Sequence, residues 1–293
     1  MKYIKRFNVL NEFNNFIFDD TNTPNVSLIE ELELPENLAF ISLIPHNYSN
    51  DYLTFIPVED STFGFSKVVL SYSLDDGDTW TELAAYDTTP TVTAGSKILW
   101  KNNTTLTPSS SSGISTFSSS KNFDVQGNIM SLYFGDDFAS QTSLSGKDYA
   151  FRKLFNSSKV RNAENLVLPA TTLIDYCYHE MFRSCTSLTS APILPATTLK
   201  IYCYPTMFCD CTSLTAAPEL PATTLKSSCY MGMFNGCTSL NYVKMLATNI
   251  SASACLQNWI NNVAASGTFV KAEGTEIPSG ASGIPEGWTI ETV

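Results

Sequence analysis

The hexapeptide Leu-Pro-Ala-Thr-Thr-Leu occupies residues Leu168–Leu173 and returns at Leu194–Leu199 and Leu220–Leu225. A Cys-Tyr pair, a Met-Phe pair and the tetrapeptide Cys-Thr-Ser-Leu follow each copy. Every element recurs at one constant interval, the interval that separates Leu168 from Leu194 and Leu194 from Leu220. A fixed period in the twenties is typical of a solenoid, because a unit this small cannot bury its apolar face without neighbours on either side. The sequence therefore predicts a stack of coils.

Comparison of the copies separates predicted core from predicted surface. Positions that keep the same residue should face inward, and they hold Leu, Cys, Tyr, Met and Phe, which are core formers. Positions that change should face solvent. One changing pair lies between the Cys-Tyr and Met-Phe pairs and reads His179-Glu180, Pro205-Thr206 and Met231-Gly232. A second pair follows the invariant leucine, on the predicted sheet side, and reads Thr189-Ser190, Thr215-Ala216 and Asn241-Tyr242.

Within each copy we expect one short strand, one turn and one short helix. Leu188–Leu194 should be extended, since Pro192 disfavours helix. Tyr202–Cys209 carries apolar residues at i, i+4 and i+5, which predicts a helix of one or two turns. The array should end in a cap helix near Leu256–Val263, and Leu154-Phe155 should begin it as a degenerate Met-Phe pair.

These motifs resemble the BspA-like leucine-rich repeat family, which occurs on surface proteins of anaerobic gut bacteria and in their phages. The resemblance covers about residues 145–264 and rests on the Cys-Thr-Ser-Leu and Leu-Pro-Ala-Thr-Thr-Leu motifs. It implies a scaffold for binding or adhesion without catalysis. It implies no particular ligand, because members of the family bind different things.

The stretch from Asp51 to about Phe134 has an all-β pattern of short strands separated by turn residues such as Asp76-Gly77, which predicts an immunoglobulin-like sandwich. The strand candidates are Tyr52–Ile56, Val68–Tyr72, Thr79–Leu83, Lys97–Trp100 and Ile129–Phe134. The Ser-rich run Thr107–Ser120 should be a long hairpin loop. Near the C-terminus, Gly267–Lys271 and Gly287–Glu291 should be closing strands, with Trp288 packed over the end of the stack.

The predicted fold class is thus multidomain α+β, with a sandwich followed by a solenoid that contains short helices. The predicted domains are an N-terminal attachment segment (1–48), an Ig-like β-sandwich (49–143), a leucine-rich repeat solenoid (144–264) and a C-terminal β cap (265–293). A formal charge of −11 disfavours nucleic acid as a partner. No apolar stretch approaches the roughly 18–20 residues of a membrane span, and the N-terminus lacks the apolar core of an export signal.

The eight cysteines are expected to be free, buried thiols. Seven of them fall in two columns at the repeat interval, Cys177, Cys203, Cys229 and Cys255, then Cys185, Cys211 and Cys237, and Cys255 continues its column beyond the third copy. Disulfides between adjacent coils remain an alternative, since neighbouring coils lie within reach of a disulfide. Because no Cys-x-x-Cys pair exists, the sequence predicts no zinc site.

One motif, Ser73–Trp80, matches the Asp-box of sialidases, Ser-x-Asp-x-Gly-x-Thr-Trp. Sialidase propellers carry several copies around several blades, and this chain carries one. The arginine cluster that would hold a sialic carboxylate is also missing, since Arg occurs only at 6, 152, 161 and 183. We therefore expect a structural turn without enzymatic activity and without calcium at Asp75, Asp76 or Asp78.

Catalysis is the least favoured reading. Only His46 and His179 are available as bases near neutral pH, and Cys177 beside His179 could suggest a Cys–His nucleophile. Cys177, however, belongs to a column repeated in every copy. No nucleophile elbow, phosphate-binding loop or dinucleotide motif is present. The sequence predicts neither an enzyme nor a cofactor, and a glycan-acting enzyme is the third hypothesis.

The leading hypothesis is a non-enzymatic phage virion protein, a fibre or capsid decoration that binds a glycan or protein of the bacterial surface. Its opening residues, Met1–Asn8, are similar to the starts of virion-associated proteins of gut phages, so segment 1–48 should dock on other virion proteins. A homotrimer is expected. The alternatives are a bacterial surface adhesin and a purely structural virion component. The predicted ligand-binding residues are Thr189, Thr215, Asn241, Tyr242, Tyr202 and His179.

Overall fold

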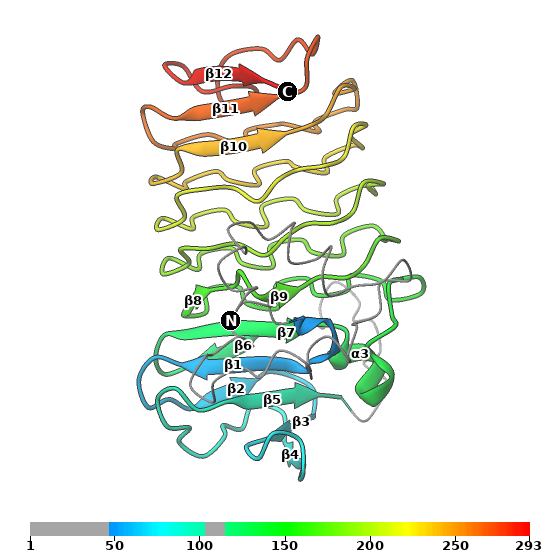
Figure 1. The fold of residues 1–293 in the computed structure, drawn as a ribbon, viewed down its shortest axis with the longest axis vertical. Coiled ribbons are helices and arrows are strands. Elements are labelled where there is room, and N and C mark those ends of the chain that lie inside the picture. The colour runs from blue at the N-terminus through cyan, green and yellow to red at the C-terminus, as the bar shows by residue number, and fades with distance from the viewer. Residues whose placement is uncertain (1–46, 103–114) are drawn as a thin grey trace, which may run out of the picture. The chain divides into compact units, whose positions relative to one another are not determined.

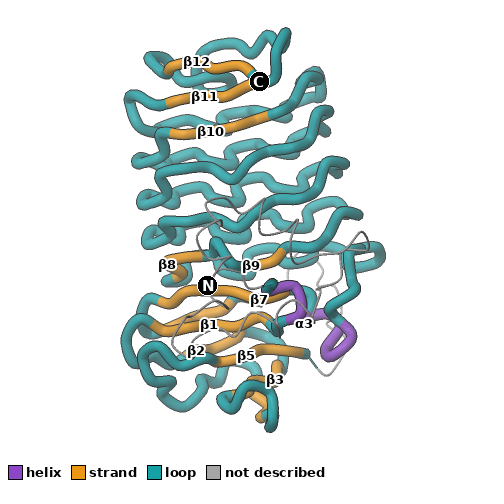
Figure 2. The backbone as a smooth tube through the Cα atoms, in the orientation of Figure 1, coloured by secondary structure: helices purple, strands orange, loops and turns teal. Residues whose placement is uncertain are grey.

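The computed structural model of this chain describes residues 47–102 and 115–293. Residues 47–293 belong to one compact unit, so the predicted boundaries at 143/144 and 264/265 fall inside it. Its described part is mostly β, with several sheets and a single short α-helix, α3 (Ser131–Phe134) (Figures 1 and 2). The predicted attachment segment 1–48 lies almost wholly outside the described residues, as does the first part of the run Thr107–Ser120. The last part of that run, predicted as a loop, contains a short strand, β6 (Phe117–Ser119).

The N-terminal part of this unit contains two antiparallel sheets, preceded by a 3₁₀ turn, η3 (Tyr48–Asn50). Its strands are β1 (Leu53–Pro57), β2 (Phe63–Phe65), β3 (Leu70–Ser73), β4 (Thr81–Leu83), β5 (Ile98–Lys101), β6 (Phe117–Ser119) and β7 (Phe123–Asn128). The larger sheet has the antiparallel order β4-β3-β5-β1-β7, and β2 pairs with β6 in the smaller one. Four of the five predicted strands are confirmed, with small shifts at their ends.

Aromatic side chains fill the space between the two sheets. Phe55 of β1 lies 5.4 Å from Phe63 of β2 and 4.8 Å from Phe117 of β6, measured between ring centroids. Trp100 of β5 packs on the same cluster, 5.5 Å from Phe55, and all four side chains are buried. Tilted and edge-on ring pairs of this kind add stability beyond the burial of apolar area.

The fifth predicted strand, Ile129–Phe134, is wrong, because the chain turns there into α3 and a 3₁₀ turn, η4 (Gly135–Asp137). Two buried polar side chains cause the turn. The Asn128 side chain accepts a hydrogen bond from the Met130 N–H at 3.0 Å, and the Ser131 hydroxyl donates to the Trp100 carbonyl at 2.8 Å. These local bonds compete with the bonds that a sheet would offer.

The strand that continues the sheet is β7, which joins the two halves of the unit. On one side it pairs antiparallel with β1, and on the other it pairs in parallel with β8 (Val160–Asn162) and β9 (Leu166–Val167) (Figure 1). Gly127 has a φ of +81°, and a Cβ there would overlap the Tyr52 carbonyl, so this junction requires glycine. The strands of the first coil therefore extend the larger sheet without a break.

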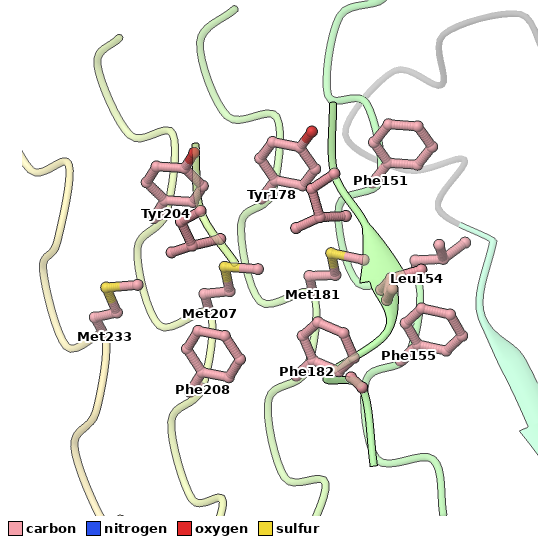
Figure 3. Packing of buried hydrophobic residues seen from close by; sticks show 14 of the residues in the cluster. Phe151, Leu154, Phe155, Tyr178, Met181, Phe182, Tyr204, Met207, Phe208 and Met233 are labelled. Carbon is pink, nitrogen blue, oxygen red and sulfur yellow. The ribbon is translucent and has the colours of Figure 1, made fainter. Parts of the chain in front are cut away.

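Successive copies stack through backbone hydrogen bonds that run from each copy to the next. The N–H groups of Tyr178, Glu180 and Phe182 donate to the carbonyls of Cys203, Pro205 and Met207, at 2.8–3.1 Å. The next copy repeats the pattern toward the third. This hydrogen-bond ladder sets equivalent side chains in rows, such as Phe155, Phe182 and Phe208 (Figure 3). Phe208 lies 5.5 Å from Phe182 and 5.6 Å from Phe234. The invariant Cys, Tyr, Met and Phe positions are buried, as predicted.

The helix predicted for Tyr202–Cys209 is a chain of tight turns, which corrects the sequence interpretation. Tyr202, Thr206 and Asp210 have left-handed φ values of 53°, 50° and 61°. The Met207 N–H donates to the Tyr204 carbonyl, which closes a four-residue turn with Thr206 at its third position. A positive φ at that position is the mark of a type II turn. The predicted cap helix at Leu256–Val263 is likewise made of turns.

On the opposite side of each copy the chain is extended, and the later copies form a parallel sheet, β10 (Tyr242–Met245), β11 (Thr268–Lys271) and β12 (Thr289–Thr292). Earlier copies make isolated bridges such as Ala216↔Tyr242. Pro192 and Pro218 lack an N–H, and Lys244 replaces them in the third copy, where a full strand forms. Both predicted C-terminal strands are confirmed as β11 and β12, and they extend the parallel sheet beyond β10.

Candidate binding surfaces

Four of the six predicted ligand-binding residues line up on the sheet side of the copies. Thr189, Thr215 and Asn241 are exposed and occupy equivalent positions. The Asn241 N–H donates to the Thr215 carbonyl at 2.9 Å, which fixes these two in register. Tyr242, which begins β10, is 39% exposed. The expectation that these changing positions face solvent is confirmed, and we call the four residues the sheet-side row.

The other two predicted residues, Tyr202 and His179, belong to the chain of turns. Tyr202 stacks on Tyr176 with a centroid distance of 4.8 Å and an interplanar angle of 5°, and Tyr176 contacts Tyr149 at 5.4 Å. Rings stacked along the copies cover one another's faces. Sugar rings pack against an aromatic face, so the covered faces of these stacked tyrosines are not available to a glycan.

His179 contributes to a buried ion cluster, contrary to the expectation that its pair of positions faces solvent. Glu180 is only 9% exposed. Its Oε1 lies 3.3 Å from His179 Nε2 and 3.5 Å from the Arg183 guanidinium, while its Oε2 lies 2.9 Å from Lys153 Nζ. The hydrogen bond to His179, followed by that to Lys153, lowers the pKa of Glu180 to about 2 despite burial. Three cationic or polar partners thus compensate one buried carboxylate.

The same changing positions in the next two copies are covered by their neighbours. Pro205 and Gly232 are buried, and a Cβ on Gly232 would lie 2.9 Å from the Thr206 methyl group. The left-handed residues of adjacent copies therefore pack side by side. A large residue in one copy requires a small one, or compensating charge, in the next. Residues vary at these positions because neighbouring copies pack against each other there. The sequence predicts instead that the variation reflects solvent exposure.

The cysteine thiols are buried, as expected, and free. The second column serves a structural purpose, because Cys211 and Cys237 donate hydrogen bonds from Sγ to the carbonyls of Phe182 and Phe208 at 3.1 and 3.0 Å. Burial raises the pKa of Cys177 to about 12. A thiol beside His179 with so high a pKa is poorly suited to act as a nucleophile, which needs a thiolate near neutral pH.

The Asp-box is a closed turn in which the carboxylate is used by the hairpin itself. Asp75 Oδ1 accepts hydrogen bonds from the Ser73 hydroxyl at 2.7 Å and the Thr79 N–H at 2.9 Å, and Oδ2 accepts from the Thr79 hydroxyl at 2.6 Å. The hydrogen bonds from Thr79 and Ser73 lower the pKa of Asp75 to about 2. Across the described residues, no group of three or more His, Cys, Asp or Glu side chains could hold a metal ion.

A buried lysine that the sequence interpretation did not single out ties this hairpin to η4. Lys101 Nζ lies 2.7 Å from Asp136 Oδ1 and 4.2 Å from the centroid of the Trp80 ring. The Tyr52 hydroxyl donates to the same carboxylate oxygen at 2.7 Å, and desolvation together with this carboxylate raises the pKa of Tyr52 to about 12. These four groups satisfy one another, which fits a structural role.

Comparison with family models, with curated proteins and with solved structures gave no match for this chain. No helix in the described ranges is long and apolar enough to cross a membrane. The functional conclusion therefore depends on the geometry of the surfaces described above.

Proposed function

We propose that this protein is a non-enzymatic component of a bacteriophage virion, a fibre or capsid decoration, which binds the surface of the bacterial host. One observation carries the proposal: the copies share an invariant buried core while the exposed sheet-side row changes from copy to copy. Such an arrangement allows contact residues to vary without disturbing the columns beneath them. Repeat proteins commonly bind through extended faces of this kind.

The proposal includes a finer description of the fold, a BspA-like leucine-rich repeat solenoid joined to an Ig-like sandwich. The hydrogen-bond ladder between successive copies, the parallel strands β10–β12 and the buried leucine and cysteine columns support the solenoid. Two sheets packed around Phe55 and Trp100 support the sandwich. The copies differ from the predicted pattern in having turns where short helices were expected.

The sheet-side row is the proposed contact surface for a glycan or protein of the host. Tyr242 offers a partly exposed ring and a hydroxyl, a combination that provides contact area at low cost in side-chain entropy. Asn241 and Thr215 place an amide and a hydroxyl beside it. Tyr202 and His179 are weaker candidates, since the Tyr202 ring is stacked on Tyr176 and His179 is part of the ion cluster.

The test is binding of fluorescently labelled protein to a panel of gut bacterial strains and epithelial cells. We expect a narrow set of bacterial strains to be labelled, and the double variant Asn241→Ala/Tyr242→Ala to lose labelling at unchanged thermal stability. A control variant, Lys226→Ala, changes an exposed residue outside the row. Labelling of epithelial cells alone would favour the adhesin. Absence of all labelling would contradict host binding and leave the structural virion role.

Assembly is the second quantity to measure. A fibre protein is expected to be a homotrimer, so light scattering should give about three times the chain mass of 32.2 kDa. A monomeric mass at micromolar concentration would contradict the fibre and leave capsid decoration as the virion role.

A further inference from the structure

The N-terminal part of the described unit carries a groove of about 360 Å³ that lies apart from the sheet-side row. Its walls come from β2, from β6, from the turn at Tyr86–Thr88 and from the segment Asn156–Lys159 that leads into β8. Residues of the sandwich and of the first coil thus converge on it. Its volume is near the lower end of the roughly 300–1,000 Å³ that small-molecule sites occupy.

Tyr86 is the most unusual residue of this groove. Tyr86 is 72% exposed and, with Tyr242, is one of two exposed aromatic residues in the described part of the chain. Its φ is +68°, in the left-handed region that glycine favours, and the Asp87 N–H donates to the Ala84 carbonyl to close a turn around it. Tyr86 therefore meets an unfavourable backbone conformation and leaves a large aromatic surface in water. The turn accounts for the backbone conformation, so the exposed ring is the feature that points to a ligand.

The remaining walls are polar and small. The Ser119 hydroxyl oxygen is buried beneath the groove and has no hydrogen-bond partner. Asp87, Thr88 and Ser118 are exposed beside Tyr86. Gly64 lies in the same wall, where a Cβ would come within 2.9 Å of the Ser118 hydroxyl. The groove thus combines one aromatic surface with many hydroxyl groups.

The charges of the groove favour a neutral ligand. Lys159 is the one cation among the lining residues, and its Nζ already donates to the Ser120 carbonyl at 2.7 Å. Asp87 supplies a negative charge, and the lining contains no arginine to grip a carboxylate or phosphate. Hydroxyl-rich walls with a carboxylate, an amide at Asn156 and an aromatic face are the groups that hold a sugar ring.

We propose that this groove binds a neutral saccharide of one or two rings, with Tyr86 packed against the apolar face of a ring. Asp87, Asn156 and Ser118 hydrogen-bond to its hydroxyl groups. The inference rests on the proposed function, because it names a neutral glycan as the host-surface component that the protein binds. It places that contact in the groove and adds it to the sheet-side row.

The test is saturation-transfer NMR on the full chain with a panel of neutral disaccharides: lactose, maltose, cellobiose and N,N′-diacetylchitobiose. We expect saturation transfer to at least one of them. The variant Tyr86→Gly should reduce the signal at least tenfold while its thermal midpoint stays level or rises, because glycine relieves the left-handed backbone. A purely structural Tyr86 would instead lower the midpoint. Ser118→Trp, which fills the groove, should also abolish binding.

Ile193→Ala serves as the matched control, since it removes a 75% exposed side chain outside both the groove and the sheet-side row and should leave the signal unchanged. Loss of signal in Tyr242→Ala with full signal in Tyr86→Gly would overturn the groove and move the saccharide to the row. Labelling of bacteria without transfer to any disaccharide would overturn the groove and leave host binding intact. Transfer in the groove without labelling of any bacterium would keep the groove and overturn the proposed function.

Discussion

The two sets of changing positions in the copies behave in opposite ways. On the sheet side, Thr215 and Asn241 vary and are exposed, whereas on the turn side Glu180 and Gly232 vary and are buried. Both sets looked alike in the sequence. The difference lies in what the neighbouring copy does: extended segments point alternate side chains to solvent, but left-handed turn residues stack against the next coil. Variation between repeats therefore indicates solvent exposure in the extended segments but not in the left-handed turns.

The largest expected effect separates the invariant columns from the sheet-side row. Phe208 is fully buried between Phe182 and Phe234, so Phe208→Ala should lower the free energy of unfolding by about 3–5 kcal/mol. Tyr242→Ala, at an exposed position, should change it by about 0.5 kcal/mol or less. Urea denaturation of both variants measures the difference. Equal losses would show that the division between core and surface is wrong.

The turn-side ion cluster should make stability depend on pH. The pKa of Glu180 is lowered to about 2, so the stabilisation from its ionised form is present above its unfolded-state pKa and lost as pH falls toward 2. Since solvent screens part of the interaction, we expect a loss of roughly 1–2 kcal/mol. The variant Glu180→Gln should flatten the change in melting temperature between pH 5 and pH 2, relative to the parent protein. An identical pH profile in both proteins would contradict the assignment.

Burial of the cysteines between the copies should also protect their thiols from alkylation. Burial raises the pKa of Cys185 and Cys237 to about 12, so neither reacts appreciably as a thiolate at pH 8. Iodoacetamide should leave the folded chain unmodified and should label all eight cysteines once urea unfolds it. Intact-mass spectrometry follows both reactions. Fewer than eight labels after unfolding without reductant would reveal disulfides between copies.

The smallest expected effect concerns backbone strain in the turns. Thr206 is β-branched and has a φ of +50°, while the equivalent position in the third copy is Gly232. Thr206→Gly removes the strain of a left-handed backbone at a β-branched residue, but it also raises the conformational entropy of the unfolded chain. The net increase in the free energy of unfolding should be about 0.5–1 kcal/mol. Gly232→Thr is the converse variant and should destabilise the protein, because its side chain would meet the Thr206 methyl group. A stability loss in Thr206→Gly would show that its packing outweighs the strain.

The repeated columns and most strands could be predicted from the sequence, because a constant period and alternating apolar residues are direct signs of shared neighbours. Phe155, predicted as a degenerate Met-Phe position, does stack on Phe182 at 5.2 Å. The turns could not be distinguished from helix, since left-handed residues every four positions leave apolar residues at the same i, i+4 spacing as a helical stripe. Their hydrogen-bond partners lie in the next copy, where a local pattern gives no sign of them.

The candidate site was predicted only in part. Thr189, Thr215, Asn241 and Tyr242 were found because copies could be compared, and no such comparison exists for the single sandwich. Tyr86 and Asn156 are distant in the sequence and line one groove because β7 pairs with β8 and so brings the segment before β8 to the N-terminal sheets. The sequence gives only a weak sign that Tyr86 belongs to a binding site, namely a tyrosine within the short segment Ala84–Asp87.

The sharing of β7 has a mechanical consequence. A strand bonded to β1 on one edge and to β8 and β9 on the other joins the N-terminal sheets directly to the repeated copies. A force applied to the N-terminal sheets is therefore transmitted to the copies by the backbone hydrogen bonds of one seven-stranded sheet. The groove and the sheet-side row therefore keep a fixed separation and orientation, so any ligand that touched both would have to match that spacing.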